Sequence, residues 1–392
     1  MKRRVFLSSS IAAGLYAGSS VASQDATRRV GVMGHTGRGN YGHGLDTVWQ
    51  NIPNAQVVGV SDGNEAGLAA ELKKLNVSSG YLDYREMLSA QQPEFVSVAP
   101  RHPDQHFDMI MAAIASGVRG IYVEKPFCRT PAEADAIVSS SLKAGTKIAV
   151  AHRNRYHPVL VLIKQMIADG QLGRLLEMRG RGKGDRRGGG ECLWVLGCHV
   201  MNLFEYIGGK PLSCSATLLT NGARVTAADV APGNEALGPL AGNEVHAHYQ
   251  MESGVFAAYD SIANDGTKDS YCMHFIGSDG VIALHIDANP VAHIVSGNPF
   301  AVDMKPRQWV PITSAGPGKP EPHPGRVADV HNHVAGVNDL IAAVDEDRQP
   351  LCDARSGALT VEMICAAFES HRQNSKSVSL PLERRDHPLN RL

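Results

Sequence analysis

Five short apolar runs between residues 28 and 150 constrain the fold more than any other feature of the sequence. The runs are VGVM (30–33), VVGV (57–60), FVSV (95–98), GIYV (120–123) and KIAV (147–150). Longer stretches with helical spacing separate them, among them 104–116, which ends at Gly117, and a stretch that begins at Thr130 and Pro131. Buried strands that alternate with helices are typical of a parallel sheet with crossover helices. Residues 28–150 are therefore predicted to form one α/β domain.

The second half of the chain has a different pattern. Strand-like segments are found at 175–181, 244–251, 255–262, 272–278 and 280–285. Helices are predicted at 157–169, 194–207, 330–343 and 357–370, and a surface loop is predicted at 315–326. Because the strand-like segments alternate with period two and follow one another through turns, they indicate a mostly antiparallel sheet. Residues 151–392 are predicted to form a second α/β domain around this large, open sheet.

The first 23 residues have the character of an export signal. Arg3 and Arg4 start it, and a mildly apolar stretch and small residues suited to a signal peptidase follow. The adjacent arginines are typical of a twin-arginine signal, which carries folded proteins across the inner membrane, and a plain secretory signal is the alternative. We therefore expect a periplasmic or otherwise exported protein.

Charge and cysteine content exclude several kinds of partner. The net charge is -1, so nothing favours nucleic acid, and no apolar run outside the signal indicates membrane attachment after export. The seven cysteines are scattered and are interpreted mainly as buried hydrophobic residues. Three groups of metal-ligand residue types stand close in the sequence: Cys192 and Cys198 with His199, His102 with His106, and His331 with His333. A structural zinc site takes four ligands, so no metal is expected at any of them.

A glycine-rich segment, GHTGRGNYG (34–42), directly follows the first predicted strand. In this position a loop places backbone N–H groups against a pyrophosphate, as in the Rossmann dinucleotide-binding motif GxGxxG. Thr36 stands where the second glycine of that motif belongs, and a loop shifted by one residue would give this role to Gly37. We predict that the cofactor contacts a set of loop residues: Gly34, Thr36, Gly37, Arg38 and Gly39.

Asp62 ends the second predicted strand, where a carboxylate can accept hydrogen bonds from the adenosine ribose. A carboxylate there repels a 2'-phosphate, so NAD is favoured over NADP as the cofactor. Two alternatives stay open: Asp62 as the N-cap of the next helix, and Arg38 as a phosphate ligand that would admit NADP.

Two further segments, APRHPDQH (99–106) and VEKPF (123–127), follow the third and fourth predicted strands. With VAHRNRYHP (150–158), DGQLGRLLE (169–177), the segment from GGG to His199 and LPLERRDHPL (380–389), they carry a resemblance that spans the chain after the signal. The chain resembles the glucose-fructose oxidoreductase and inositol dehydrogenase family, often written Gfo/Idh/MocA. The EKP tripeptide is the most specific part. The resemblance and the open sheet favour a homo-oligomer, a dimer or a tetramer.

Lys125 is the first catalytic candidate. A lysine at the carboxyl end of a parallel strand can donate to a substrate hydroxyl and stabilise the alkoxide that develops as hydride leaves. The resemblance implies that Lys125 lies beside the nicotinamide and that its bond to Pro126 is cis. We expect Pro100, His106 and Glu124, from the same strand ends, to contact the cofactor as well.

His199 is the second catalytic candidate, because an imidazole suits the abstraction of a hydroxyl proton near neutral pH. Many relatives carry an Asp four residues before this histidine and another three residues after it. Here these positions are Val195 and Asn202, so the carboxylate that would orient the imidazole is missing, with Glu191 as one substitute. Arg155, His199 and Asn202 are predicted to bind the substrate.

Together these features predict an exported NAD(P)-dependent oxidoreductase. It would transfer hydride between a tightly bound cofactor and a secondary alcohol of a sugar, polyol or glycoside. Two alternatives are kept. One is a hydrolase or lyase that oxidises a sugar transiently and reduces it again, and the other is a non-catalytic sugar- or nucleotide-binding protein.

Overall fold

The computed structural model describes residues 27–267, 270–286, 288–302 and 306–392. The predicted export signal at residues 1–23 lies outside the described residues. None of the helices in these ranges combines the length and the apolar character that crossing a bilayer requires.

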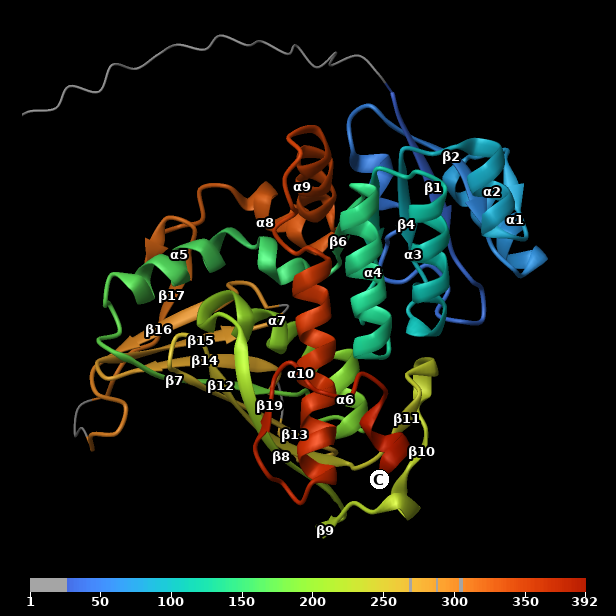
Figure 1. Ribbon diagram of the computed structural model, residues 1–392. Helices are drawn as coiled ribbons and strands as arrows, with labels where there is room; N and C mark the ends of the chain where they lie inside the picture. The colour runs from blue at the N-terminus through green and yellow to red at the C-terminus, as the bar shows by residue number, and fades with distance from the viewer. Residues whose placement is uncertain (1–26, 268–269, 287, 303–305) are drawn as a thin grey trace, which may run out of the picture.

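The first domain is built on a six-stranded parallel sheet (Figure 1). Its strands are β1 (Arg28–Met33), β2 (Ala55–Ser61), β3 (Gly80–Tyr81), β4 (Phe95–Val98), β5 (Gly120–Val123) and β6 (Lys147–Val150). The five predicted strands are confirmed, and the two-residue β3 was not predicted. The order is β3-β2-β1-β4-β5-β6, so the direction of winding reverses between β1 and β4. Ligands of such sheets bind in the crevice outside this reversal.

Helices cover both faces of this sheet. They are α1 (Glu65–Leu75), α2 (Tyr84–Gln91), α3 (His106–Ala115) and α4 (Pro131–Ala144), with short 3-10 turns η1 (Val48–Asn51) and η2 (Pro103–Gln105). The start of α4 is as predicted, because Thr130 accepts a hydrogen bond from the Glu133 N–H and Pro131 occupies the first turn. The glycine-rich segment, by contrast, leads into turns and η1 rather than into a regular helix.

The second sheet has eleven strands and is mostly antiparallel. Along its path lie β18 (Gly316–Pro317), β17 (Val310–Thr313), β16 (Ala292–Ser296), β15 (Gly280–His285), β14 (Cys272–Gly277), β7 (Leu175–Arg181), β13 (Phe256–Ile262), β12 (Glu244–Met251), β8 (Pro211–Thr220) and β19 (Val378–Ser379), and β9 (Ala223–Arg224) pairs with β8. Only β7 and β13 pair in parallel. In β12 the side chains of Val245, Ala247 and Tyr249 are buried and those of His246 and His248 point outward. This alternation confirms the predicted open sheet with one packed face.

The remaining elements lie around these two sheets. They are η3 (Arg153–Tyr156), α5 (Pro158–Ala168), η4 (Ala227–Asp229), η5 (Asn234–Ala236), a small ribbon of β10 (Ala231–Pro232) and β11 (Pro239–Leu240), α8 (Pro324–His331), α9 (Val334–Asp345) and η6 (Pro388–Arg391). The predicted helix at 330–343 is thus two helices. His333 separates them with a positive φ of 67°. The loop predicted at 315–326 contains the short strand β18 and the start of α8.

The apolar helix predicted at 194–207 is also two helices, α6 (Gly190–Val195) and α7 (Gly197–Gly208). The break falls at Leu196, whose backbone is not helical. Helix α7 lies close against β7, because a Cβ atom at Gly180 would approach Val200 to 2.2 Å and Phe204 to 3.2 Å. This contact fixes the first turn of α7, which carries His199, over the packed face of the second sheet.

The long helix α10 (Ala354–Arg372) joins the two sheets and is buried along most of its length. Near its start, a Cβ atom at Gly357 would meet Val150 and Phe127 of the first domain within 3.0 Å. Near its end, Ser370 Oγ and His371 Nδ1 accept hydrogen bonds from backbone N–H groups of β8, at 2.8 and 3.0 Å. Figure 1 shows α10 between the helices of the first domain and the second sheet. The helix therefore sets the position of one sheet relative to the other.

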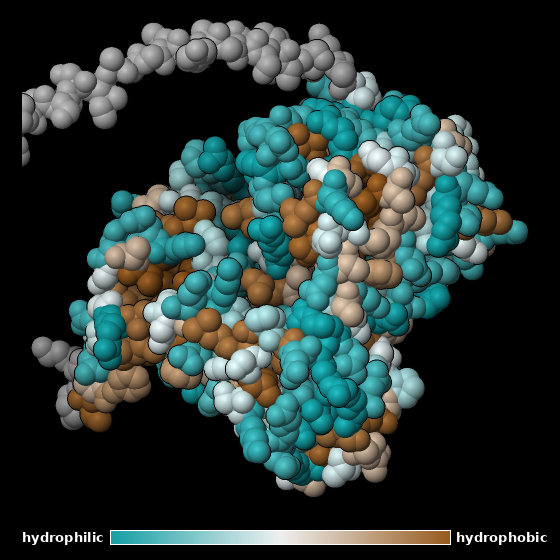
Figure 2. All heavy atoms as spheres, viewed as in Figure 1, coloured by the Kyte–Doolittle hydropathy of each residue, from teal (hydrophilic) through white to brown (hydrophobic). Residues whose placement is uncertain are grey.

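Hydrophilic residues prevail on the face shown in Figure 2, and apolar residues gather toward the end where α5 and β17 lie. Exposed apolar side chains in this region of the chain include Val161 in α5 and Trp309 beside β17. The dimer or tetramer stays a prediction.

Candidate active site

A pocket of about 250 Å³ opens between the two sheets. One side of it is lined by residues that follow the glycine-rich segment or the strands of the first sheet: His43, Arg101, Glu124, Lys125 and Arg153. The second domain lines it from α6, α7 and neighbouring loops: Lys183, Arg187, Val195, His199 and Tyr271. The pocket thus lies at the carboxyl ends of β4, β5 and β6, where open parallel sheets bind ligands. The predicted catalytic residues, Lys125 and His199, both line it.

The glycine loop borders this pocket, and its geometry shows which glycines matter. A Cβ atom at Gly39 would lie 2.4 Å from the backbone nitrogen of Arg101, and one at Gly42 would lie 2.7 Å from the carbonyl oxygen of Ala99. Gly37, Gly39 and Gly42 all have a positive φ. The motif GxGxxG is therefore complete at 37–42, three residues beyond the start at Gly34. Reading the same spacing from Gly37 would have found it.

The structure gives Asp62 contacts other than those predicted. Its carboxylate is 1% exposed and accepts hydrogen bonds from the N–H and hydroxyl of Thr36, the hydroxyl of Tyr41 and the N–H of Asn64. These donors occupy the lone pairs of both oxygens. A ribose contact by Asp62 would require one of them to leave. The N-cap alternative is wrong, because Asn64 caps α1.

Glu124 is the fully buried charge of the site. Its Oε1 accepts from the Lys125 N–H at 3.1 Å and lies 3.2 Å from His43 Nδ1. Burial alone raises the pKa of a carboxyl group. Here the hydrogen bond from His43 and the charge of Lys125 outweigh burial and lower the pKa of Glu124 to about 2. Glu124 is therefore an anion, and its carboxylate connects the backbone of Lys125 with the side chain of His43.

Lys125 reaches from the first domain to the second. Its Nζ donates to the carbonyl oxygen of Val195 at 3.3 Å and lies 3.8 Å from Glu124 Oε1. The Lys125–Pro126 peptide bond is cis, as the resemblance implied. At position 195 the resemblance implies an Asp side chain. In this chain the backbone carbonyl of Val195 holds the Lys125 ammonium group instead.

His199 packs against another histidine instead of a carboxylate. Its ring lies edge-on to that of His152, with 5.3 Å between the centroids. Burial, with the nearby His152 and the charge of Lys125, lowers the pKa of His199 well below 6.5. Within the described ranges no carboxylate bonds its buried Nδ1. The proposed substitute Glu191 instead accepts from Asn234 at 2.7 Å.

Two residues predicted to bind substrate lie outside the pocket. Arg155 is buried, forms an ion pair with Glu205 and donates to the carbonyl oxygen of Asn202 at 3.0 Å. Asn202 donates to Cys352 Sγ. Both belong to a buried network that joins η3, α7 and α10, so we reassign them to packing. Arg153, two residues earlier, lines the pocket.

Two residues predicted to contact the cofactor make other contacts in the structure. His106 is fully buried, with Nε2 at 2.7 Å from the Pro100 carbonyl oxygen and Nδ1 at 2.9 Å from that of Pro126. It therefore connects the turns after β4 and β5. Arg38 of the loop pairs with Asp104 and is partly exposed.

Several lining residues were not predicted. His43 directly follows the last glycine of the 37–42 motif. Its place next to this motif is the sequence feature from which it could have been predicted. Arg101 forms an ion pair with Glu235 across the pocket at 3.3 Å. His333 lines the pocket, and its Nδ1 shares a hydrogen bond of 2.9 Å with the Tyr122 hydroxyl. No local sequence motif predicts that His333 lies there.

The residues of the glycine loop and of the adjoining pocket fit a bound dinucleotide. A Cβ atom at Gly37 would meet nothing within 4 Å, so one side of the loop is open. Glu124 Oε2 is buried and has no partner among the described residues, which leaves an acceptor for a ligand donor. The lining carries more cationic than anionic side chains, as an oxyanion or pyrophosphate requires. The loop at 37–42, Glu124 and Lys125 would hold the cofactor.

Comparisons with known proteins agree with this geometry. A model described as an oxidoreductase family with an NAD-binding Rossmann fold, Gfo/Idh/MocA, matches residues 28–152. Its companion, the C-terminal alpha/beta domain of the same oxidoreductase family, matches residues 164–380. Together the two models cover most of the chain.

Among curated proteins, D-apiose dehydrogenase from Paraburkholderia graminis is 31% identical over 125 residues, which are 32% of this chain and 33% of that protein. Levoglucosan dehydrogenase from Pseudarthrobacter phenanthrenivorans is 22% identical over 67% of this chain and 72% of its own length. A solved levoglucosan dehydrogenase in complex with NADH and levoglucosan has a TM-score of 0.72 at 20% identity. It covers 90% of this chain and 99% of that one, and shows a shared fold.

A pair of loop variants tests the close passage at Gly39. Gly37→Ala and Gly39→Ala both place a side chain at a positive φ, which costs about 1 kcal/mol. Only the Cβ atom at position 39 would also meet backbone. We expect Gly39→Ala to lower the free energy of unfolding by at least about 1 kcal/mol more than Gly37→Ala. Urea unfolding measures the free energy of unfolding of both variants. Equal losses of stability would contradict the close approach of Gly39 to the backbone of Arg101.

Proposed function

Because the chain belongs to the Gfo/Idh/MocA family of oxidoreductases, with its NAD-binding Rossmann fold, we propose that it oxidises a secondary alcohol of a sugar, polyol or glycoside. One observation carries the proposal. Lys125 from the first domain and His199 from the second line the same pocket, together with His43, which directly follows the glycine loop. The relatives D-apiose dehydrogenase and levoglucosan dehydrogenase support a carbohydrate substrate.

Lys125 is the group that stabilises charge on the substrate oxygen. Its ammonium is held by the Val195 carbonyl and the Glu124 carboxylate, at 3.3 and 3.8 Å, while the lysine still lines the pocket. A preorganised cation aimed at a hydroxyl favours the alkoxide that develops as hydride leaves. When bound, NAD supplies the acceptor for that hydride.

His199 is the group that accepts the hydroxyl proton. It is neutral at physiological pH, because burial and the adjacent His152 and Lys125 lower the pKa of its ring. A neutral imidazole has one nitrogen free to accept a proton. The protonated ring would lie beside Lys125, so the geometry favours prompt release of the proton to solvent through the pocket mouth.

We also propose that the protein is exported with its cofactor already bound. The support is the sequence of residues 1–23 with its paired Arg3 and Arg4. Since free NAD is scarce outside the cytoplasm, a folded and loaded protein explains how such an enzyme would work there. Replacing both arginines by lysine should retain the protein in the cytoplasm on cell fractionation, whereas unchanged export would point to a plain secretory signal.

Removing the ammonium group tests the proposed function. Lys125→Met keeps the apolar stem, and we expect kcat on the best substrate of a sugar and polyol panel to fall about 100- to 1000-fold. NADH binding, followed by its fluorescence, should weaken far less than turnover, because the loop at 37–42 and Glu124 still hold the cofactor. Lys143→Met, in the last turn of α4 and away from the pocket, is the matched control. Unchanged turnover by Lys125→Met would overturn the role of Lys125.

The pH profile tests the role of His199. A base must be unprotonated to act, and a base whose pKa lies below 6.5 stays unprotonated to lower pH. We therefore expect kcat/KM for alcohol oxidation to fall on the acid side only well below pH 6.5. A measured acid limb at or above pH 6.5, together with its loss in His199→Asn, would show that the imidazole is not perturbed as described.

A further inference from the structure

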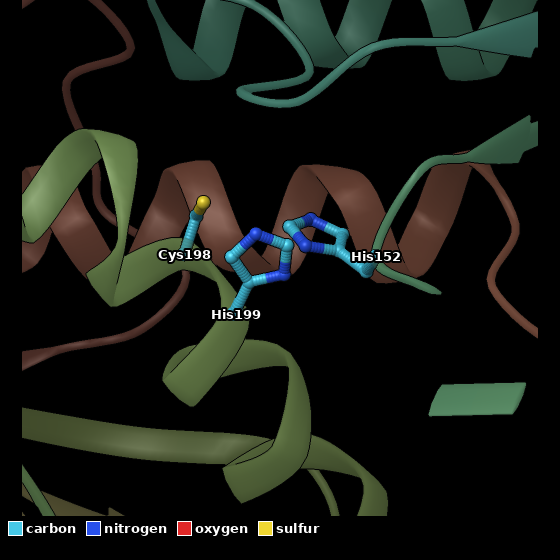
Figure 3. Close-up of side chains that lie close together, drawn as sticks. All are labelled: His152, Cys198 and His199. Atoms are coloured by element: carbon cyan, nitrogen blue, oxygen red, sulfur yellow. The ribbon is translucent and has the colours of Figure 1, made fainter. Parts of the chain in front are cut away.

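Three residues that can bind a metal meet at the inner end of the pocket, where one of them, His199, lines it. His152 follows β6, and Cys198 and His199 start α7. One ligand atom from each lies within 4.8 Å of the other two. Figure 3 shows the His199 ring between the Cys198 sulfur and the His152 ring. The sequence did not predict this grouping, because His152 follows β6 and lies far from Cys198 and His199 in the sequence.

Both histidines of this group have buried ring nitrogens without a hydrogen-bond partner among the described residues. His152 is 1% exposed, and in the described part of the chain neither its Nδ1 nor its Nε2 has a hydrogen bond. The buried Nδ1 of His199 also has none. A buried polar atom without a partner costs about 1–3 kcal/mol. His152 thus contributes a buried nitrogen without a partner that lies within 4.8 Å of a ligand atom of His199 and of the Cys198 sulfur, and this indicates a ligand that the protein is built to receive.

The donor set identifies the class of ligand. Two imidazole nitrogens and a sulfur, with no carboxylate oxygen among them, suit Zn²⁺ and similar transition metals and do not suit Mg²⁺ or Ca²⁺. Three protein ligands with a fourth position open to a pocket are typical of zinc sites other than structural ones. We propose that His152, Cys198 and His199 bind one Zn²⁺ ion at the inner end of the pocket.

The protonation states are compatible with this site. Burial and the charges of Lys125 and Arg155 lower the pKa of His152 to about 3, so its ring is neutral, as a metal ligand must be. Burial raises the pKa of the Cys198 thiol to about 12, although Lys125 acts in the opposite direction. The ion must displace the thiol proton, so its affinity rises with pH. The thiolate offsets part of the repulsion between the ion and Lys125.

Metal binding and proton acceptance exclude each other at His199. A coordinated neutral imidazole has no free lone pair, whichever nitrogen binds the ion. The ion would therefore inhibit alcohol oxidation, a consequence that rests on the proposed function. The site itself does not, because its occupancy is measured without any substrate.

Cobalt titration of the full-length purified protein tests the site directly. We expect one Co²⁺ per chain, an absorption band of a thiolate–cobalt bond, and displacement of that band by one equivalent of Zn²⁺. Cys198→Ser should abolish the band, and His152→Asn should weaken Co²⁺ binding at least about 10-fold. Cys272→Ser, which removes a partly exposed cysteine of the second sheet, is the control and should bind like the unmodified protein.

Several results would overturn the proposal. They are a band that survives Cys198→Ser, no binding at millimolar metal, or binding that depends on the outward histidines of β12. Circular dichroism establishes that each variant is folded, and two variants of different ligands keep the test independent of either one. With substrate in hand, Zn²⁺ should inhibit the unmodified protein and spare Cys198→Ser. Failure of dehydrogenase activity leaves the cobalt result intact and is thus distinguished from failure of the site.

Discussion

The close passage of the glycine loop over the ends of β4 and β5 is the constraint on which the candidate active site depends. At Gly39 the loop meets the backbone after β4, and at Gly42 it meets Ala99 and the carboxylate of Glu124, so no side chain fits at either position. The passage brings His43 to Glu124 and leaves the loop beside Lys125. A sheet that reverses its winding between β1 and β4 provides the space for this crossing. Helix α10 then holds the second domain, with His199, against the same opening.

The electrostatics of the site follow from burial combined with a few charges. Glu124 stays ionised because His43 and Lys125 lie against it, and His199 stays neutral because it is buried near Lys125. The pocket therefore presents a fixed cation and a neutral base to its ligand. This division of roles suits the removal of a proton from an alcohol oxygen and of a hydride from the carbon that bears it. It also leaves unpartnered nitrogens on His152 and His199, from which the proposed metal site follows.

Much of the fold could be predicted from the sequence, because every strand of the first sheet except β3 is a short apolar run typical of a buried strand. Lys125 and His199 were found because a motif and a very apolar helix mark them. Other features depend on tertiary contacts that carry no local signal. Arg155 and Arg153 are two residues apart, and only packing against Glu205 decides which is buried. Asp62 fits the ribose pattern, yet Thr36 and Tyr41 occupy its oxygens. The break at Leu196 and the meeting of His152 with Cys198 likewise arise from the two domains together.

The central claim is that one crevice receives the nicotinamide from the glycine loop and the ammonium group of Lys125. A crystal structure of the protein with NAD bound tests it most directly. The account predicts the pyrophosphate against residues 37–42 and the nicotinamide ring in the pocket, in contact with Lys125 and facing His199. A nucleotide bound elsewhere, or a nicotinamide ring that turns away from Lys125, would contradict it.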